Sequence, residues 1–314
     1  MKRPSELPDM LAAAFSVASA SEIGVGDGRL RGRDLGHPFH GVRTRHPVLP
    51  DAQIRELCRA YVPRMAEHQF FSHETALALS GHSMPGWPYR PGIHVSTHRP
   101  RREPRTRGVV GHRLQARESA VRTTRDGLPV EDPARAWRQC GSLWVLDDLI
   151  AAADSLAFDA TQGASLMQLR DEIEIMGDVR DGLLRRALAE ARDGVRSPRE
   201  TRLRLLLVRA GLPEPEINWV LRDHRGVFVA ELDLAYPRWK VTPEYDGRVH
   251  AEDAAQFARD ADRWEAIRRA GWRHVRCLDH HVRGRGIPAV RLVVAALMEA
   301  GWTPPRTMSQ YLLP

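Results

Sequence analysis

The stretch from residue 227 to residue 250, VFVAELDLAYPRWKVTPEYDGRVH, decides how the second half of the chain folds. It holds two runs in which apolar and polar residues alternate, and alternation with a period of two predicts β-strands. The short segment 237–239 between the runs predicts a hairpin. Because residues two apart share a face of a strand, Asp233 on the first strand and Glu244 on the second are expected to lie close together.

The sequence on both sides of these strands predicts an α/β (α+β) arrangement. We expect a helix, three strands, a long helix, a strand and a last helix. Their approximate bounds are 197–211, 217–223, 227–237, 240–247, 251–271, 272–279 and 289–301. An antiparallel meander followed by a helical crossover to another strand is common to many α/β cores, so the order of elements narrows the class of fold and leaves the function to the charged residues.

Asp233 and Glu244 are the candidate metal ligands. Carboxylates placed together in a half-buried sheet repel each other and lose hydration, unless a cation neutralises them. Mg²⁺, or Mn²⁺ in its place, prefers one or two carboxylates together with waters and phosphate oxygens, and can polarise a scissile phosphate. The alternative is that both acids form ordinary ion pairs with arginines such as Arg238 or Arg276.

Three further residues are candidates for supporting roles in catalysis. Glu200 stands three residues after Ser197 and thus completes a capping box, which explains it without any role as metal ligand or water orienter, although that role stays open. Asp246 precedes a glycine, where aspartate commonly sets a tight turn. His250 is either a surface residue or a general acid or base held near the phosphate.

Composition limits the class of protein. A chain of 314 residues predicts two or three domains. It has no apolar run that would span a bilayer and its start lacks the pattern of a signal peptide, so we expect a cytoplasmic protein without a membrane partner. The net charge of +7 comes almost wholly from arginine, since the only lysines are Lys2 and Lys240. Both a genome rich in G and C and a nucleic-acid partner explain this bias.

Residues 1–50 predict a small winged-helix-like module. A helix with Leu11 and Phe15 on its apolar face, a glycine-rich turn, a short second helix and a β-hairpin follow one another. In a winged helix-turn-helix the second helix enters a major groove of DNA, and arginines contact phosphates. The expected DNA-contacting residues on that helix and on the wing are Arg29, Arg31, Arg33, Arg43 and Arg45. A helical hairpin with solvated arginines would have the same sequence.

Residues 51–162 predict a middle α+β domain, and residues 163–314 the last domain. The middle domain contains helices and short strands, and nine arginines stand between Arg99 and Arg125. They belong either to a solvated loop between the strands of a hairpin or to a surface that follows a phosphate backbone. The sequence does not separate these two interpretations.

The last domain resembles a known nuclease family. The runs SPRETRLRLLLVRAGLP, AELDLAYP, PEYDGRVH and DADRWEAIRRAGWRHVRC resemble uncharacterised bacterial proteins related to very-short-patch-repair endonucleases, in the PD-(D/E)XK superfamily. The resemblance implies a restriction-endonuclease-like mixed sheet of four strands flanked by helices, and Mg²⁺-dependent phosphodiester cleavage. It also implies Asp233 and Glu244 as the acidic pair, with Glu200, Asp246 and His250 in support.

The chain departs from that superfamily at one place, because Asp246 stands where its motif has lysine.

The first 160 residues resemble abortive-infection-type antitoxins, through the winged-helix-like start and the runs FSHETALALSG and GLPVEDPARAW. Together these features predict an endonuclease, a hydrolase acting on double-stranded DNA in repair or phage defence. The alternative is a catalytically inactive, nuclease-like DNA-binding regulator or antitoxin, which Asp246 and the strand-breaking Pro243 favour.

Overall fold

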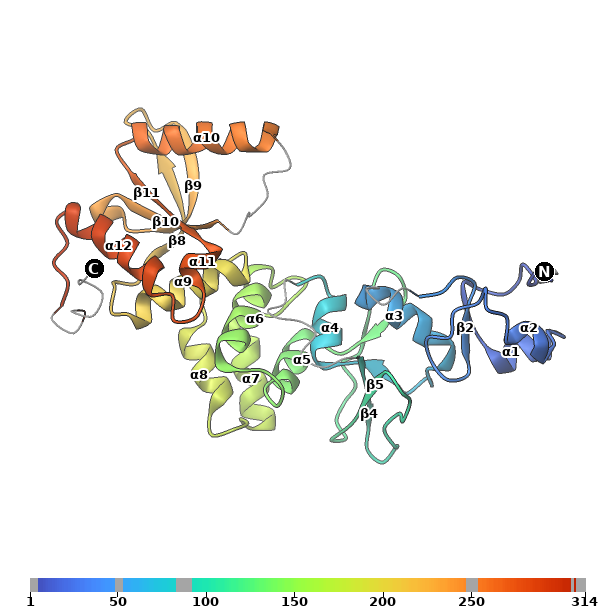
Figure 1. Cartoon of the computed structure of the whole chain (residues 1–314). Coiled ribbons are helices and arrows are strands. Elements are labelled where there is room, and N and C mark those ends of the chain that lie inside the picture. Colours follow the sequence, from blue (N-terminus) through green and yellow to red (C-terminus); the bar gives the residue numbers. More distant parts are fainter. Residues whose placement is uncertain (1–4, 49–52, 83–91, 247–253, 306–307, 309–314) are drawn as a thin grey trace. The chain divides into compact units, whose positions relative to one another are not determined.

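A computed structural model describes residues 5–48, 53–82, 92–246, 254–305 and 308, with the backbone alone at 254–259 (Figure 1). The fold mixes helices with several sheets, as the sequence predicted. The chain divides into two compact units, one made of Met1–Leu149 and Ala160–Arg185, the other of Ile150–Asp159 and Arg186–Pro314. The finer division into domains at 50 and 162 stays a prediction. None of the described helices is long and apolar enough to cross a membrane.

The start of the first unit differs from the predicted winged helix. Its elements are β1 (Ala14–Ser16), α1 (Val17–Glu22), α2 (Asp27–Leu30) and β2 (Val42–Thr44). The chain is extended before α1 because Ser16 is the N-cap, its hydroxyl accepting a hydrogen bond from the Ser19 amide at 2.9 Å. β2 pairs antiparallel with β1, and the predicted wing hairpin is reduced to one bridge between Gly36 and Thr44. The predicted start of the helix, over Leu11 and Phe15, was therefore wrong, whereas the predicted order of helix, turn and short helix is present in α1 and α2.

The rest of the first unit is built on a mixed five-stranded sheet. Its elements in chain order are α3 (Ile54–Tyr61), η1 (Val62–Arg64), β3 (Phe70–Phe71), α4 (His73–Leu79), β4 (Ile93–His98), β5 (Val109–Leu114), β6 (Arg122–Thr123), β7 (Pro129–Val130), α5 (Pro133–Cys140) and α7 (Leu166–Met176). The strands lie in the order β5-β4-β3-β7-β6. β4 and β5 pair in parallel, so the arginine-rich segment between them returns the chain to the start of β4 and the expected hairpin was wrong.

Two helices contribute residues to both units. α6 (Leu146–Phe158) is in the first unit as far as Leu149 and in the second from Ile150, and α8 (Leu183–Glu190) changes unit after Arg185. Within the second unit, Asp154 of α6 is fully buried and accepts hydrogen bonds from Thr201 and Arg204. These bonds join α6 to the helix that begins the predicted nuclease-like core.

The second unit has the predicted order of elements. They are α9 (Pro198–Arg209), β8 (Glu216–Arg222), β9 (Phe228–Ala235), η2 (Pro237–Trp239), β10 (Val241–Asp246), α10 (Ala254–Arg269), β11 (Arg273–Leu278), α11 (Asp279–Val282) and α12 (Ile287–Glu299). β8 pairs antiparallel with β9, and β10 pairs in parallel with β11. The short helices η2 and α11 are the additions that periodicity did not predict.

β9 and β10 lie side by side with few backbone hydrogen bonds between them. The chain turns between the strands at an antiparallel bridge from Tyr236 to Val241, and the Thr242 hydroxyl donates to the Leu234 carbonyl at 2.8 Å. No regular ladder joins these two described strands. Pro243 has no N–H to donate, which is a physical reason for the interruption that the sequence anticipated at this residue.

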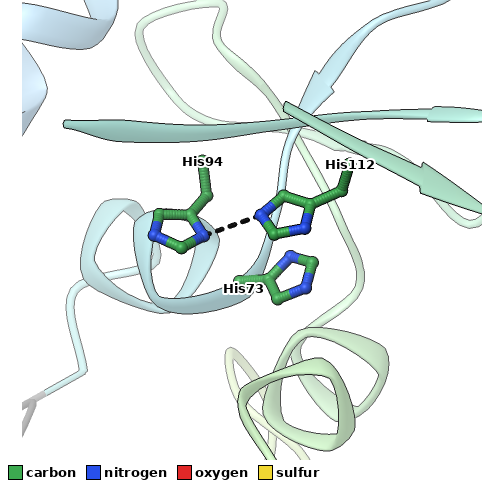
Figure 2. A group of neighbouring side chains, drawn as sticks. All are labelled: His73, His94 and His112. Atoms are coloured by element: carbon green, nitrogen blue, oxygen red, sulfur yellow. Dashed lines mark hydrogen bonds between the residues drawn. The ribbon is translucent and has the colours of Figure 1, made fainter. Parts of the chain in front are cut away.

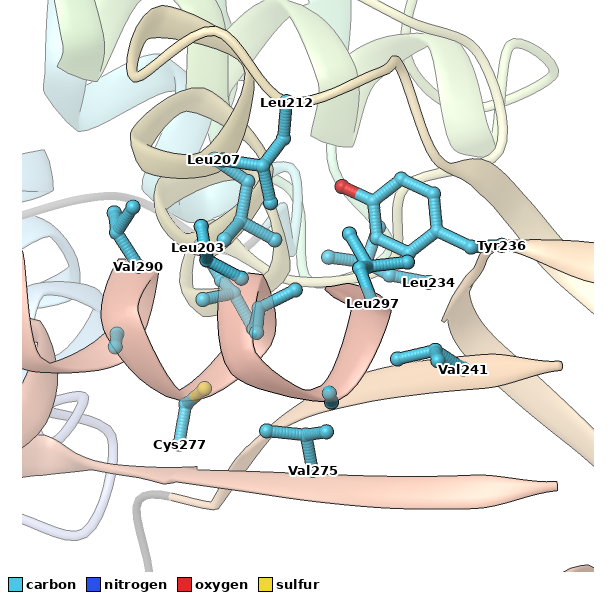
Figure 3. Packing of buried hydrophobic residues seen from close by; sticks show 14 of the residues in the cluster. Leu203, Leu207, Leu212, Leu234, Tyr236, Val241, Val275, Cys277, Val290 and Leu297 are labelled. Carbon is cyan, nitrogen blue, oxygen red and sulfur yellow. The ribbon is translucent and has the colours of Figure 1, made fainter. Parts of the chain in front are cut away.

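Apolar side chains cover the sheet from two sides. Figure 3 shows Leu203 and Leu207 of α9 beside Leu297 of α12, above β10 and β11. A second cluster contains Leu232 of β9 and Ile267 of α10. Helices on both sides therefore hold β9 and β10 in place even though few backbone hydrogen bonds cross between them.

Candidate functional site

Four of the five predicted catalytic residues lie on neighbouring elements of the second unit. Asp233 is on β9, Glu244 and Asp246 are on β10, and Glu200 is in the first turn of α9. His250 lies outside the described residues. The structure therefore brings the four acidic residues to one region of the second unit, where their carboxylates differ in their partners.

Asp233 is the acidic residue without a partner. Its side chain is partly buried, and no hydrogen bond or ion pair reaches its carboxylate from the described part of the chain. Burial and the charges of Glu200 and Glu244 raise the pKa of Asp233 from 3.8 to about 6, against the opposing effect of Arg263 and Arg196. Asp233 thus lies near two other carboxylates, as its place on the strand predicted.

Glu244 has two partners. Its Oε2 atom accepts hydrogen bonds from Arg263 at 2.9 Å and from the His274 ring at 2.8 Å. Burial alone would raise the pKa of Glu244, but these hydrogen bonds and the charge of Arg263 lower it to about 2. Glu244 is therefore a carboxylate held ionised and already balanced by a cation, so the predicted ion-pair alternative is present with Arg263 in place of Arg238 or Arg276.

Arg263 is a site residue that the sequence did not identify. The side chain of Arg263 turns inward to Glu244 and also donates to the Glu231 carbonyl at 2.9 Å. It therefore joins α10 to both β9 and β10. A signal was present in the sequence, since Arg263 neighbours Trp264 on a helix that follows the acidic strands, but spacing alone does not show which way a long side chain turns.

Arg276 and Trp264 complete this side of the site. The Arg276 guanidinium lies 4.0 Å from the centre of the Trp264 ring and forms an ion pair with Asp246 at 2.5 Å. Trp264 also stacks on His274, with ring centres 5.6 Å apart. A cavity of about 660 Å³ beside these rings is lined by residues of α10 and the start of β11, including Arg268. None of the four acidic residues lines this cavity, and its link to them is His274, which lines the cavity and contacts Glu244.

Glu200 and Asp246 have the local roles that the sequence allowed for them. The Glu200 amide donates to the Ser197 hydroxyl at 3.2 Å, and the Glu200 carboxylate accepts from that hydroxyl and from the Arg196 amide. This confirms Ser197 as the N-cap, but the Glu200 carboxylate accepts from the Arg196 amide instead of the Ser197 amide, so the reciprocal bond of the predicted capping box is shifted by one residue. Asp246 is buried at the end of β10, where it forms an ion pair with Arg276 of β11.

The carboxylate oxygens at this site are the ligands that Mg²⁺ prefers, but in the described part of the chain three of them do not lie close enough together to surround an ion. Asp233, Glu244 and Glu200 offer carboxylate oxygens, which Mg²⁺ prefers, and the repulsion at Asp233 is what a cation would relieve. In the described residues, however, no three of these acidic groups have ligand atoms within 4.8 Å of one another. Because Mg²⁺ commonly uses one or two carboxylates and completes its shell with water, Asp233 and Glu244 remain a sufficient pair.

Three of the five N-terminal arginines are used inside the first module. Arg29 forms an ion pair with Asp34 at 2.7 Å, while Arg43 and Arg45 donate to backbone carbonyls. Such arginines hold the chain together instead of presenting charge to a phosphate. Arg31 and Arg33 are exposed. The expected contacts from Arg29, Arg43 and Arg45 to DNA are therefore not supported by where the side chains lie.

Comparison with known proteins gives two relatives. No family model matches the chain, and no solved structure matches it. Uncharacterised proteins of two strains of Mycobacterium tuberculosis, MT2308 and Rv2248, are each 28% identical to it over 195 residues. The match covers 60% of this chain and 62% of each relative. The chain is thus similar to a mycobacterial protein over more than half its length, and the names of these relatives state no activity.

Proposed function

We propose that the second unit is a Mg²⁺-dependent endonuclease acting on double-stranded DNA. The observation that carries the proposal is the position of Asp233, a partly buried carboxylate with no partner and with Glu200 and Glu244 beside it. Repelling carboxylates without a partner cost stability, and proteins retain such strain where a cation or a reacting group is bound. The resemblance to very-short-patch-repair-like proteins agrees with this function.

Each residue has a distinct task in the proposed site. Asp233 and Glu244 would hold the ion, and Mg²⁺ bound there would polarise the scissile phosphate and make a coordinated water more acidic. Arg263 and His274 hold the Glu244 carboxylate ionised and oriented. Arg276, on the adjacent strand β11, adds positive charge for the developing negative charge on the phosphate. Glu200 orients the first turn of α9 through its cap.

The test is a plasmid-nicking assay on the full chain. Supercoiled DNA is incubated with the protein in Mg²⁺, Mn²⁺, Ca²⁺ or EDTA, and we expect nicking with Mg²⁺ or Mn²⁺ only. The double variant Asp233→Ala/Glu244→Ala should fall to the background of the buffer, while Asp262→Ala, an exposed acid on α10, should nick as the parent chain does. Equal nicking by the double variant would remove the assignment.

A second candidate is a DNA-binding regulator that has lost catalysis. It is favoured by one observation, which is that Glu244 and Asp246 are both already neutralised, by Arg263 with His274 and by Arg276. A protein of this kind shifts a DNA duplex in a gel with an affinity that falls as salt rises, yet leaves plasmid intact in every divalent metal. Cleavage by the parent chain that depends on Asp233 would exclude it.

A further inference from the structure

Three histidines gather in the first unit, far from the acidic site in sequence. His73 is the first residue of α4, His94 lies on β4 and His112 lies on β5. One ligand atom from each ring lies within 4.8 Å of the other two, and within the described residues no other group of three histidines, cysteines or acids is so close. His73 and His94 are buried and His112 is partly buried. Figure 2 shows the three rings turned toward one another.

The sheet register explains why the rings meet. β4 and β5 run in parallel with Ser96 opposite His112, so His94 and His112 are neighbours across the pair. The His94 Nδ1 atom lies 2.9 Å from the His112 Nε2 atom, and the His73 ring stacks on His112 with centres 3.7 Å apart. His73 takes a left-handed backbone conformation, with φ of 51°, which is uncommon for a residue other than glycine. Local strain of this kind is found where a side chain must be aimed.

Two of the rings have a polar group beside their other nitrogen. The His73 Nδ1 atom lies at hydrogen-bond distance, 2.9 Å, from the Ser72 hydroxyl. The His94 Nε2 atom lies 3.3 Å from an oxygen of Glu74, within reach of an ion pair but without a hydrogen bond between the two buried atoms. Glu74 is fully buried, and its second oxygen accepts a hydrogen bond from the Trp144 indole at 2.9 Å. Metal-bound histidines characteristically have a carboxylate, carbonyl or hydroxyl beside the remaining nitrogen, which leaves the other nitrogen for the ion.

The chemistry of the donors selects the metal. Three imidazoles with a buried carboxylate behind one of them suit Zn²⁺ and other ions that prefer nitrogen, whereas Mg²⁺ requires oxygen ligands. Two nitrogens bound tetrahedrally at about 2.0–2.1 Å from Zn²⁺ stand roughly 3.3 Å apart, so His94 and His112 need to separate only slightly.

We infer that His73, His94 and His112 form a Zn²⁺ site in the first unit, with water as the fourth ligand. The ligands come from α4, β4 and β5, so the ion ties the helix to the edge of the five-stranded sheet. This site is separate from the proposed Mg²⁺ site in residues, unit and metal preference. Nothing in the proposed nuclease requires it.

The first test measures metal bound to the tag-free full chain. After treatment with a chelator, the chain is loaded with Zn²⁺ or Co²⁺, dialysed and analysed, and we expect about one ion per chain. Bound Co²⁺ should show the strong visible absorption of a four-coordinate ion. His112→Gln should lose the ion, whereas His98→Gln should keep it, since His98 lies at the end of β4 and packs on Phe70 outside the group. A parent chain that retains no metal, or a His112→Gln chain that retains a full equivalent, overturns the inference.

A second measurement does not depend on the folding of a variant. X-ray absorption of the Zn²⁺-loaded parent chain should show imidazole nitrogens at about 2.0–2.1 Å and no sulfur at about 2.3 Å. Sulfur in the shell would place the ion at the cysteines and overturn the assignment. Glu74→Gln keeps all three ligands and should weaken Zn²⁺ binding by about 10–100-fold, because the carboxylate behind His94 is lost. Unchanged affinity in that variant would contradict the proposed role of Glu74.

Discussion

Replacing Asp154 with alanine should destabilise the second unit by about 3–5 kcal/mol, because it leaves a buried arginine without its carboxylate. Asp154 and Arg204 are each 1% exposed and form an ion pair at 3.1 Å between α6 and α9. Asp154 also accepts hydrogen bonds from the Thr201 hydroxyl and the Arg192 amide, at 2.8 and 2.7 Å. The variant therefore removes three hydrogen bonds as well as the counter-charge.

Urea denaturation of the parent chain and its variants measures this effect. Asp154→Asn should be intermediate, because Arg192 and Thr201 bond different oxygens of Asp154 and the single amide oxygen can still accept from one of them while the charge is lost. Asp262→Ala, at an exposed position, should stay within about 0.5 kcal/mol of the parent chain. A loss below about 1 kcal/mol in Asp154→Ala would show that Arg204 is stabilised without this carboxylate, by Glu214 and the Glu190 carbonyl.

Asparagine at position 233 should make the metal-free protein more stable at neutral pH. Since the folded state raises the pKa of Asp233 from 3.8 to about 6, folding favours the protonated carboxyl. Stability from this group is complete below about pH 4 and is lost as the pH rises through 6, when the ionised form must be kept near Glu200 and Glu244. Asp233→Asn avoids that loss. After allowance for solvent screening, the gain at pH 7.5 is about 1–2 kcal/mol.

The pH dependence distinguishes this effect from a general one. Urea denaturation with EDTA present should give a gain for Asp233→Asn at pH 7.5 that shrinks toward zero near pH 4. Adding Mg²⁺ should stabilise the parent chain and leave Asp233→Asn unchanged, because a ligand stabilises only the state that binds it. Asp262→Asn serves as the control on α10. A variant less stable than the parent at pH 7.5 would mean that Asp233 has a favourable partner.

The order of elements in the second unit could be read from the sequence because local signals agreed there. The cap at Ser197, the alternation around Asp233 and the apolar stripe of the last helix each predicted the element that formed. The first module offered conflicting signals, since Phe15 fits either an apolar helix face or a strand. There the pairing of β1 with β2 decided, and strand partners distant in sequence cannot be derived from periodicity.

The site residues that sequence patterns did not identify depend on contacts between residues far apart in the chain. Arg263 and His274 approach Glu244 only because α10 and β11 return to the same sheet. The three histidines stood in three separate runs, each with an ordinary strand or helix pattern, at spacings of no known metal motif. Parallel pairing of β4 with β5 brings them together, and the sequence had predicted a hairpin there.

The interrupted pairing of β9 with β10 has a mechanical consequence for the acidic pair. Asp233 and Glu244 stand on the two described strands, β9 and β10, between which β-ladder hydrogen bonds do not fix the spacing. Packing against α9, α10 and α12 sets the separation there, and side-chain packing yields to a small displacement more readily than a ladder does. The distance between the two carboxylates near Pro243 can therefore change while the β8–β9 and β10–β11 pairs stay intact.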